Sequence, residues 1–459
     1  MTHCFNSTIL REYDIRGIVG DTLTEADAYA LGRSYAALAG EEGARRIAVG
    51  RDGRTHSGML EAALIRGLTE GGIDVMQIGM GPSPMLYFAT HYLDVEGGIQ
   101  VTGSHNPADY NGFKMLLKGR SVFGQEIQAL GRRAASGDWS EGDGSIEEVD
   151  IREAYVNRLL EGFSGKAYRI GWDAGNGAAG PVLDMLVEQL PGHHHVLFSQ
   201  VDGTFPNHHP DPTVEKNLAD LKALVAREQL DFGIAFDGDG DRIGAVDGKG
   251  RVIWGDQLLM ILAVPVLQEL PGATLIADVK ASQSFFDRVA ELGGTPLMWK
   301  TGHSLIKAKM KETGAPLAGE MSGHIFFKHR WYGFDDALYA AVRLIEAISA
   351  SGQSLTEIMD AMPKTTATPE LRFQVDESRK FAIVEEVRDR LSADGAKVDA
   401  TDGVRVSTGD GWWLLRASNT QDVLVARAEA ADQSGLDRLV AQIDDQLEKS
   451  GVERVEAVH

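Results

Sequence analysis

Cysteine is almost absent from this sequence: its 459 residues include one, Cys4. An intrachain disulfide and a thiolate zinc cluster are therefore excluded, and a reducing compartment such as the cytoplasm is favoured. Long hydrophobic runs are absent as well. The longest, Leu258 to Leu267, has ten residues and contains Pro265, whereas a membrane span needs ~20. The first residues lack a charged stretch followed by an apolar core, so we expect no secretory signal and no membrane partner.

Basic residues are scarce relative to acidic ones. The 45 Lys and Arg residues against 67 Asp and Glu residues give a formal net charge of −22, which is the wrong sign for a protein that holds nucleic acid by neutralising its phosphates. Glycine is in excess, with 53 of 459 residues against a usual ~7%. At about 100–200 residues per domain, the length predicts roughly three domains.

Three stretches of the sequence share one pattern: a short apolar strand, an aspartate among small or polar residues, then a helix. They cover residues 45–54, 168–177 and 273–282. Strands that alternate with helices in this way are typical of α/β domains with largely parallel sheets. Ligands bind at the carboxyl ends of the strands in such sheets, so functional residues are expected there. We predict three similar α/β units with mixed sheets.

The last part of the chain follows a different order. After a stretch rich in proline and threonine, expected to be a linker over 362–369, the pattern predicts strands at 370–375, 404–407, 411–416 and 422–428 and helices at 378–391 and 434–449. Antiparallel neighbours of this kind form an α+β domain. Another boundary is expected in the polar, acidic stretch 137–150. The predicted domains are 1–149, 150–251, 252–363 and 364–459.

Ser104 lies in the loop Thr102-Gly103-Ser104-His105-Asn106-Pro107, which follows an apolar strand. The glycine allows a tight turn and the Asn-Pro pair stops a helix from starting at once, so the serine hydroxyl is held at the end of a strand. Ser104 is a candidate nucleophile. The alternative is an ordinary polar turn, because serine, asparagine and proline are common turn residues.

Three carboxylates alternate with glycine in the loop Asp237-Gly238-Asp239-Gly240-Asp241-Arg242. Tight folding of such a loop brings the carboxylates together, and their repulsion requires a cation between them. Three carboxylates leave one side of the site open, as is usual for Mg²⁺ that a phosphate oxygen completes, and Arg242 would suit that phosphate. The alternative is a solvated acidic turn.

Two further loops offer polar groups. One carries an acid, a hydroxyl and an imidazole that could bracket the hydroxyls of a sugar: Glu320, Ser322 and His324. The other follows a strand and supplies a guanidinium with three short donors, a combination suited to phosphate: Arg416, Ser418, Asn419 and Thr420. Taken alone, either loop could be an ordinary surface turn.

A glycine pattern at 175–180 leaves a different function open. Residues Gly175 to Gly180 match G-x-G-x-x-G between a strand and a helix, so a dinucleotide site and an NAD-dependent oxidoreductase are conceivable. The pattern is weak by itself, and Asp173 would lie unfavourably close to a pyrophosphate.

Together, the four loops resemble the α-D-phosphohexomutase superfamily, most closely its bacterial phosphomannomutase/phosphoglucomutase branch, over essentially the whole chain. The order and spacing of TGSHNP, DGDGDR, GEMSGH and RASNT carry the resemblance, together with Tyr13-Asp14-Ile15-Arg16 near the start. It implies three similar α/β units and a smaller C-terminal α+β domain around a central cleft. We predict that the last domain closes over the substrate, because its phosphate-binding loop lies beyond the expected linker and water must be kept from a phosphoserine. One departure is Asp422, near where relatives often carry proline.

The resemblance also implies a reaction. Ser104 would be carried as a phosphoserine, and Asp237, Asp239, Asp241 and one phosphate oxygen on Ser104 would hold Mg²⁺. The phosphoserine would donate to mannose or glucose 1- or 6-phosphate, and the resulting hexose 1,6-bisphosphate would turn while bound and return its other phosphoryl group. This transfers phosphate reversibly between C1 and C6.

Further roles follow from the same resemblance. Arg16 and Lys114 would stabilise the transferring phosphoryl group, with His105 and Arg242 near it, and Lys114 or His324 would be the general acid or base. Glu320 and Ser322 would hold the sugar hydroxyls. The remaining substrate-binding residues, most of them for the non-reacting phosphate, would be Tyr13, Lys280, His303, Arg416, Ser418, Asn419 and Thr420.

Two rival classes remain: the NAD-dependent oxidoreductase and a non-catalytic sugar-phosphate-binding protein. Neither requires TGSHNP and DGDGDR together. A monomer is the default expectation, since no long exposed apolar stripe demands a partner.

Overall fold

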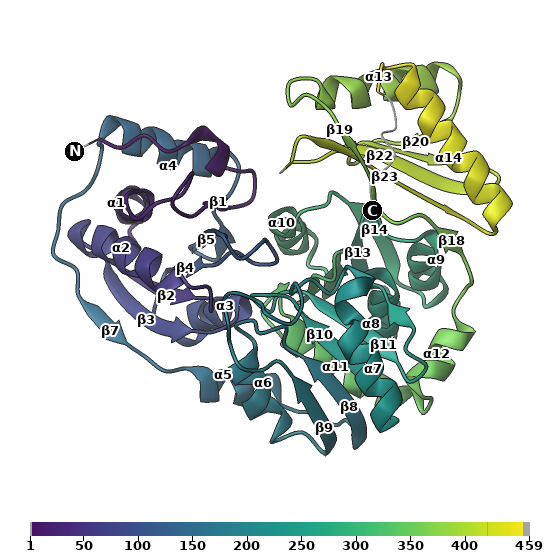
Figure 1. Cartoon of the computed structure of the whole chain (residues 1–459), viewed down its shortest axis with the longest axis horizontal. Coiled ribbons are helices and arrows are strands. Elements are labelled where there is room, and N and C mark those ends of the chain that lie inside the picture. Colours follow the sequence, from purple (N-terminus) through teal and green to yellow (C-terminus); the bar gives the residue numbers. More distant parts are fainter. Residues whose placement is uncertain (1, 420, 453–459) are drawn as a thin grey trace.

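The computed structural model describes residues 2–419 and 421–452. The chain forms four sheets with packed helices, and Figure 1 shows the first at the left, the fourth at the upper right and the other two between and below. We call the chain around each sheet a unit. Three α/β units and a smaller C-terminal α+β unit confirm the predicted fold class. No helix in the described ranges has the length and apolar character needed to cross a membrane.

The first unit has the strand order β1-β5-β4-β2-β3-β7, with β6 paired to β5. Its strands are β1 (Ile15–Ile18), β2 (Arg46–Arg51), β3 (Asp74–Met80), β4 (Gly97–Val101), β5 (Tyr110–Leu117), β6 (Arg120–Ser121) and β7 (Ile146–Glu148). Its helices are η1 (Ser7–Ile9), α1 (Glu25–Glu41), α2 (Ser57–Glu70), α3 (Ser83–Tyr92) and α4 (Gln125–Ser136).

The second unit has the order β12-β11-β10-β8-β9. Its strands are β8 (Tyr168–Asp173), β9 (Gly192–Leu197), β10 (Phe232–Phe236), β11 (Ile243–Asp247) and β12 (Val252–Ile253). Its helices are α5 (Arg152–Leu159), α6 (Gly180–Val187), η2 (Glu215–Leu218) and α7 (Ala219–Glu228).

The third unit has the order β14-β13-β15-β16-β17. Its strands are β13 (Thr274–Asp278), β14 (Thr295–Trp299), β15 (Leu317–Gly319), β16 (Ile325–Phe327) and β17 (Phe334–Asp335). Its helices are α8 (Gly255–Glu269), α9 (Gln283–Glu291), α10 (His303–Thr313), α11 (Ala337–Ser351) and α12 (Leu355–Ala361).

The predicted repeat is present in all three sheets, and it contains more strands than the one that the sequence pattern marks. We call that marked strand the signature strand. The signature strands β2, β8 and β13 each lie between two parallel neighbours, and the second of these neighbours continues into an antiparallel strand: β4 into β5, β10 into β11, β15 into β16. The turn between that last pair is therefore the same structural position in each unit. In the first unit this turn holds Ser104. In the second it is the loop Asp237–Arg242, which we call the aspartate loop, and in the third it is the loop Glu320–His324, which we call the Glu320 loop.

Burial explains why these segments form covered strands and helices. All residues of β4, β10 and β11 are buried, as expected for a sheet covered on both faces. The longest apolar run of the sequence lies in α8, inside a core shared by the first three units. Phe88, Trp172 and Phe327, one from each unit, belong to this core. The three units are thus held together by continuous apolar packing.

The fourth unit is an antiparallel sheet with the order β18-β23-β22-β21-β20 and β19 also on β23. Its elements are β18 (Thr366–Ala367), β19 (Leu371–Gln374), α13 (Lys380–Ala393), β20 (Lys397–Asp399), β21 (Val404–Ser407), β22 (Gly411–Ala417), β23 (Val423–Ala430) and α14 (Gln433–Glu448). The linker predicted over 362–369 is wrong in part, because Thr366 and Ala367 pair with β23. A short edge strand can form next to prolines, because proline is tolerated at a sheet edge. The proline-rich composition therefore gave no indication of this strand.

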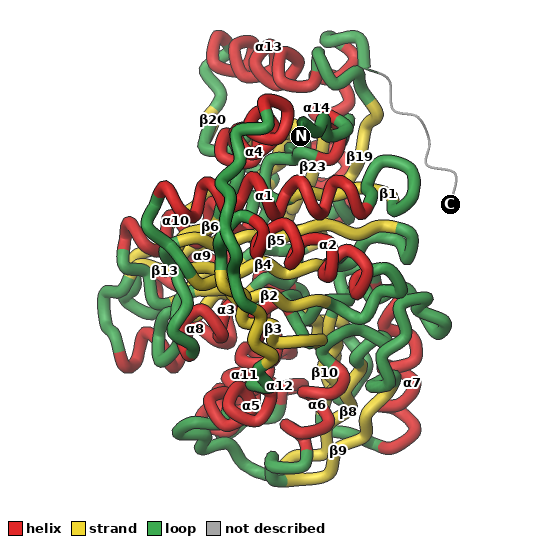
Figure 2. The backbone as a smooth tube through the Cα atoms, turned by 90° about the vertical axis from the view of Figure 1, so that its left-hand side faces the viewer, coloured by secondary structure: helices red, strands yellow, loops and turns green. Residues whose placement is uncertain are grey.

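The acidic stretch after α4 is an extended strap. Figure 2 shows the connection running from α4 past α1 and α2 to β7 at the edge of the first sheet. The Trp139 indole donates to the Ser34 hydroxyl at 3.0 Å, and the Arg33 guanidinium donates to the Ser140 carbonyl at 2.8 Å. These bonds fix the strap on the first unit.

Candidate active site

The equivalent turns of the first three units meet beside the fourth unit at a cavity of about 1050 Å³. Residues of all four units line it, which matches the predicted central cleft. The sequence-predicted residues on its wall are Tyr13, Arg16, Ser104, His105, Lys114, Arg242, Lys280, His303, Glu320, Ser322, His324, Arg416, Ser418 and Asn419. Thr420, also predicted, lies outside the described residues.

Ser104 has a left-handed backbone, with φ of 50°. This conformation is uncommon for a residue other than glycine and costs of order 1–3 kcal/mol, so the surrounding structure must hold it. The Ser104 N–H donates to the Thr102 hydroxyl at 2.8 Å, and the Ser104 hydroxyl lies 3.2 Å from both the Asp237 carboxylate and Nδ1 of His105. The candidate nucleophile is thereby placed against the aspartate loop.

Arg54 and Asp52, at the end of β2, hold the Ser104 loop. The Arg54 guanidinium donates to backbone carbonyls of the loop, at 2.7 Å to Ser104 and 2.6 Å to Asn106. The Asp52 carboxylate accepts from the Thr102 hydroxyl and the Gly103 N–H at 2.8 and 2.9 Å. A Cβ on Gly103 would lie 2.2 Å from the guanidinium, so any larger residue there would displace Arg54 from the loop.

Neither Asp52 nor Arg54 was among the predicted site residues. The signal was present, because Asp52 is the aspartate of the first signature strand, where function was expected.

All three carboxylates of the aspartate loop are buried. One oxygen from each of them lies within 4.8 Å of the other two. The loop closes on itself, because the Asp237 carboxylate accepts the N–H groups of Asp241 and Arg242 at 3.1 Å each. A Cβ on Gly238 would lie 2.4 Å from the Ser104 carbonyl. Glycine at that position therefore lets the two loops touch.

Lys114, on β5, reaches into the aspartates. Its Nζ lies 2.7 Å from Oδ2 of Asp239 and also contacts Oδ2 of Asp241, as an ion pair. Burial lowers the pKa of Lys114, but the two aspartates outweigh it and hold the pKa well above its usual value. Burial and the neighbouring carboxylates raise the pKa of Asp237 far above its usual range. The loop thus concentrates negative charge, which Lys114, Arg242 and His324 oppose.

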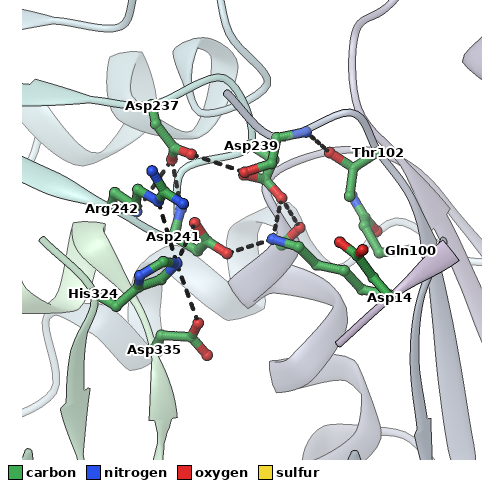
Figure 3. A network of polar contacts seen from close by, with 12 residues as sticks. Asp14, Gln100, Thr102, Asp237, Asp239, Asp241, Arg242, His324 and Asp335 are labelled. Carbon is green, nitrogen blue, oxygen red and sulfur yellow. Dashed lines mark hydrogen bonds and ion pairs between the residues drawn. The ribbon is translucent and has the colours of Figure 1, made fainter. Parts of the chain in front are cut away.

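The donor set fits a hard divalent cation. Oδ1 of Asp239 is buried and has no hydrogen-bond partner within residues 2–419 and 421–452, and a buried unpaired carboxylate oxygen is costly. Figure 3 shows Asp237, Asp239 and Asp241 converging from one loop. Carboxylate oxygens in such an open arrangement are the ligands that Mg²⁺ prefers.

His324 links the third unit to this loop. Its Nδ1 lies 3.0 Å from the Glu320 carboxylate and 2.9 Å from the Ser322 hydroxyl, and its Nε2 lies 3.4 Å from the Asp241 carboxylate. In Figure 3 the ring stands between Asp241 and Asp335, a buried carboxylate 4.0 Å away that the sequence analysis did not identify. Burial opposes the charge, but Asp241 and the other carboxylates raise the pKa of His324 to about 9.

The pKa values of the other two site histidines shift in the opposite direction. Burial, assisted by Arg242 and Arg16, lowers the pKa of His105 well below its usual value. Burial, assisted by Lys307 and Lys114, does the same for His303. The cavity therefore surrounds its three imidazoles with different electrostatic environments.

Cations on the cavity wall are paired with carboxylates. Arg16 contacts Asp14, Lys280 lies 3.1 Å from Glu370, and Arg416 lies 2.9 Å from Asp402. These carboxylates were not among the predicted site residues, although Asp14 lies in the motif Tyr13-Asp14-Ile15-Arg16. An anionic ligand would compete with them for the same cations.

The fourth unit touches the first across the cavity. The Asn419 amide donates to the Tyr13 hydroxyl at 2.6 Å, and that hydroxyl donates to the Thr301 carbonyl at 2.9 Å. Three units therefore meet at Tyr13.

The glycine pattern at 175–180 is used for packing. A Cβ on Gly177 would lie 2.8 Å from the Gly238 carbonyl, and one on Gly180 would lie 1.9 Å from the Ser199 carbonyl. The Ala178 N–H donates to the Gly238 carbonyl at 2.9 Å. These glycines bring the backbone close to other backbone, and they support the aspartate loop from behind.

Comparison with known proteins agrees with this geometry. The four domains described for phosphoglucomutase/phosphomannomutase match the chain in order: alpha/beta/alpha domain I over residues 7–141, domain II over 153–250, domain III over 254–366 and the C-terminal domain over 370–446.

Individual relatives match along nearly the whole length. The phosphomannomutase/phosphoglucomutase of Pseudomonas aeruginosa is 46% identical over 442 residues, 96% of each chain, and the phosphoglucomutase of Neisseria gonorrhoeae is 46% identical over 436 residues, 94% of this chain and 95% of that protein. The crystal structure of a phosphoglucomutase/phosphomannomutase family protein from Burkholderia thailandensis is 42% identical, has a TM-score of 0.92 and covers 97% of this chain and 98% of its own. By its domains, its relatives and its fold, the chain belongs to the phosphoglucomutase/phosphomannomutase family.

Proposed function

We propose that the protein transfers a phosphoryl group reversibly between C1 and C6 of mannose and glucose phosphates, through a phosphoserine on Ser104 and a hexose 1,6-bisphosphate. Family membership supports the reaction class. The observation that carries the proposal is the meeting of the Ser104 hydroxyl with the Asp237 carboxylate at 3.2 Å, on the wall of a cavity that also holds the phosphate-binding cations.

Asp237, Asp239 and Asp241 would hold Mg²⁺ together with a phosphate oxygen on Ser104. A bound Mg²⁺ neutralises charge on the transferring phosphoryl group and aligns it. The unpaired Asp239 oxygen supports this assignment. The protein contributes buried ligands in a loop already closed by its own backbone hydrogen bonds.

Cations of the chain would stabilise the phosphoryl group in transfer. Arg16 and Lys114 are buried on the cavity wall, and Nε and Nη1 of Arg16 have no hydrogen-bond partner in the described part of the chain. Those donors are available to phosphate oxygens, and preorganised donors of this kind are the main source of catalysis in phosphoryl transfer. His105 and Arg242 flank the same position.

The sugar would lie between this centre and the fourth unit. Lys280, His303, Arg416, Ser418, Asn419 and Thr420 would hold the non-reacting phosphate, with Tyr13 beside them. Glu320 and Ser322 would hold sugar hydroxyls. When the phosphoryl group leaves Ser104 for a sugar hydroxyl, the proton of that hydroxyl needs an acceptor. Lys114 and His324 remain the two candidates, since both line the cavity next to Asp241.

We also propose the domain division 1–149, 150–251, 252–363 and 364–459, with closure of the fourth unit over the substrate. The contacts from Asn419 to Tyr13 and from Glu370 to Lys280 are the ones that closure would change. Small-angle scattering with and without glucose 1-phosphate tests this, and an unchanged profile would count against closure. The monomeric state and the cytoplasmic location stay predictions.

A coupled isomerase assay tests the function. The protein is given mannose 1-phosphate or glucose 1-phosphate with Mg²⁺ and a trace of hexose 1,6-bisphosphate, and intact mass is measured in parallel. We expect turnover of both sugars and one phosphoryl group on Ser104. Ser104→Ala should lose both, while Ser136→Ala, an exposed serine of the first unit, should keep both.

The rival classes give different results in the same assay. A sugar-phosphate-binding protein would bind without turnover, and an oxidoreductase would bind NAD and carry no phosphoryl group. Absence of turnover with both sugars would overturn the proposal.

A further inference from the structure

Ser83, the first residue of α3, lies against the aspartate loop. Its side chain is fully buried, and it belongs to the first unit, whereas the loop belongs to the second. The Ser83 hydroxyl donates to Oδ2 of Asp239 at 2.5 Å. Its backbone N–H donates to the Asp239 carbonyl at 2.8 Å. Ser83 thus bonds to both the side chain and the backbone of Asp239.

The two oxygens of the Asp239 carboxylate have different surroundings. Oδ2 accepts from both the Ser83 hydroxyl and the Lys114 ammonium. Oδ1 has no hydrogen-bond partner in the described ranges, although the side chain is fully buried. A carboxylate whose one oxygen is occupied by donors presents the other to a cation, as in outer-shell contacts that orient metal ligands.

We propose that Ser83 is a positioning residue for the metal site: it orients Asp239 so that Oδ1 faces the cation. The proposal rests on the proposed function, because it presumes a divalent cation at the three aspartates.

Ser83 keeps this role when Lys114 acts elsewhere. Lys114 also pairs with Asp241 and is a candidate acid or base toward the sugar, and in that role its contact with Asp239 would change. Asp237 is fixed by backbone N–H groups of its own loop. Asp239 is bonded instead by Ser83, the first residue of α3. Because Ser104 is also on the first unit, this contact ties the aspartate loop to the unit that carries the candidate nucleophile.

Mg²⁺ titration of the full-length protein tests the proposal. Calorimetry is run on wild type and on Ser83→Ala, Ser83→Cys and Ser83→Thr, with Ser34→Ala as the matched control. Ser34 is another buried serine of the first unit, bonded to Trp139.

Ser83→Ala should weaken Mg²⁺ binding ~10–100-fold, the usual effect of losing an outer-shell partner. Ser83→Cys, which keeps the volume with a weaker donor, should also bind more weakly. Ser83→Thr keeps the hydroxyl and should lie within a few-fold of wild type. Ser34→Ala should bind Mg²⁺ as wild type does.

Activity gives a second measurement. The Mg²⁺ concentration for half-maximal turnover should rise by the same factor in Ser83→Ala, with little change in KM for the sugar phosphate and recovery of kcat at high Mg²⁺. Unchanged Mg²⁺ affinity in folded Ser83→Ala, or in Ser83→Cys if the alanine variant does not fold, would overturn the role of Ser83. Absence of Mg²⁺ binding by wild type would instead overturn the metal site itself.

Discussion

The Ser104 loop and the aspartate loop occupy the same position in two copies of one fold, yet they are held differently. The first follows β4, and the second follows β10. Arg54, from a neighbouring strand end, fixes the Ser104 loop through its backbone carbonyls. The aspartate loop is closed by its own N–H groups on the Asp237 carboxylate, and Ser83 and Ala178 bond to it from outside. The repeat therefore supplies the position, and a different set of residues holds each loop there.

The signature aspartates show the same division. Asp52 accepts hydrogen bonds from the functional loop of its own unit, and so does Asp278, from the Met321 N–H at 3.2 Å. Asp173 accepts instead from the Gly175 N–H and lies 3.0 Å from His208. Other residues hold the aspartate loop, so the strand-end aspartate of the second unit holds the adjacent turn instead.

The largest effect is expected in the aspartate loop. Asp241→Asn removes charge that holds Lys114 and the cation, so kcat/KM should fall ~10³-fold, as when a main electrostatic group is lost. Steady-state kinetics at saturating Mg²⁺ measures it. Asp184→Asn, an exposed carboxylate on α6, is the control and should be unchanged. A loss below tenfold would show that the loop does not carry the chemistry.

A smaller effect is expected when the support of the Ser104 loop is removed. Arg54→Met leaves the loop carbonyls without their donor, and the resulting displacement of Ser104 should slow phosphoryl transfer ~100-fold. Rapid-quench measurement of phosphoserine loss checks it. Arg33→Met also removes a bond to a backbone carbonyl of the first unit but is remote from Ser104, so it should keep the wild-type rate. Equal rates in the two variants would contradict the comparison.

Asp278, the signature aspartate of the third unit, should make the free energy of unfolding depend on pH. Burial raises the pKa of Asp278 from 3.8 to about 6, against the attraction of Lys280. Folding therefore takes up a proton between these pH values, and this residue makes stability fall as pH rises through that window. Wild type should lose on the order of 2 kcal/mol more than Asp278→Asn between pH 4 and 7. Urea unfolding of both proteins across this range measures the difference. If the free energy of unfolding of the two proteins changes equally with pH, the prediction is wrong.

The smallest effect is expected at the contact between the third and fourth units. Glu370→Gln removes the carboxylate that competes with substrate phosphate for Lys280, so KM should fall roughly 2–5-fold with kcat nearly unchanged. Glu377→Gln, which alters an ion pair with Lys380 away from the cavity wall, is the control. A higher KM would mean that Glu370 helps to place Lys280 for substrate.

Much of the site could be read from the sequence because its chemistry is local. Ser104, the three aspartates and Glu320 lie in short loops where glycine, serine and aspartate at fixed spacing already restrict the backbone. The repeat was visible only at its first strand, since later strands are ordinary apolar runs. Ser83 and Arg54 were missed because each acts through a partner distant in the sequence, and Asp335 was missed because it lies outside the four loops.

The four loops, the α/β repeat and the change to an antiparallel sheet at the end could be predicted from neighbouring residues, because periodicity and turn composition are local properties. The fold was needed to see that three of the loops are equivalent turns, that Lys114 enters the aspartate loop, and that Ser83 holds Asp239 from another unit. Those facts depend on contacts between residues far apart in the chain, such as the 156 positions from Ser83 to Asp239. Packing brings such residues together, and no local pattern records it.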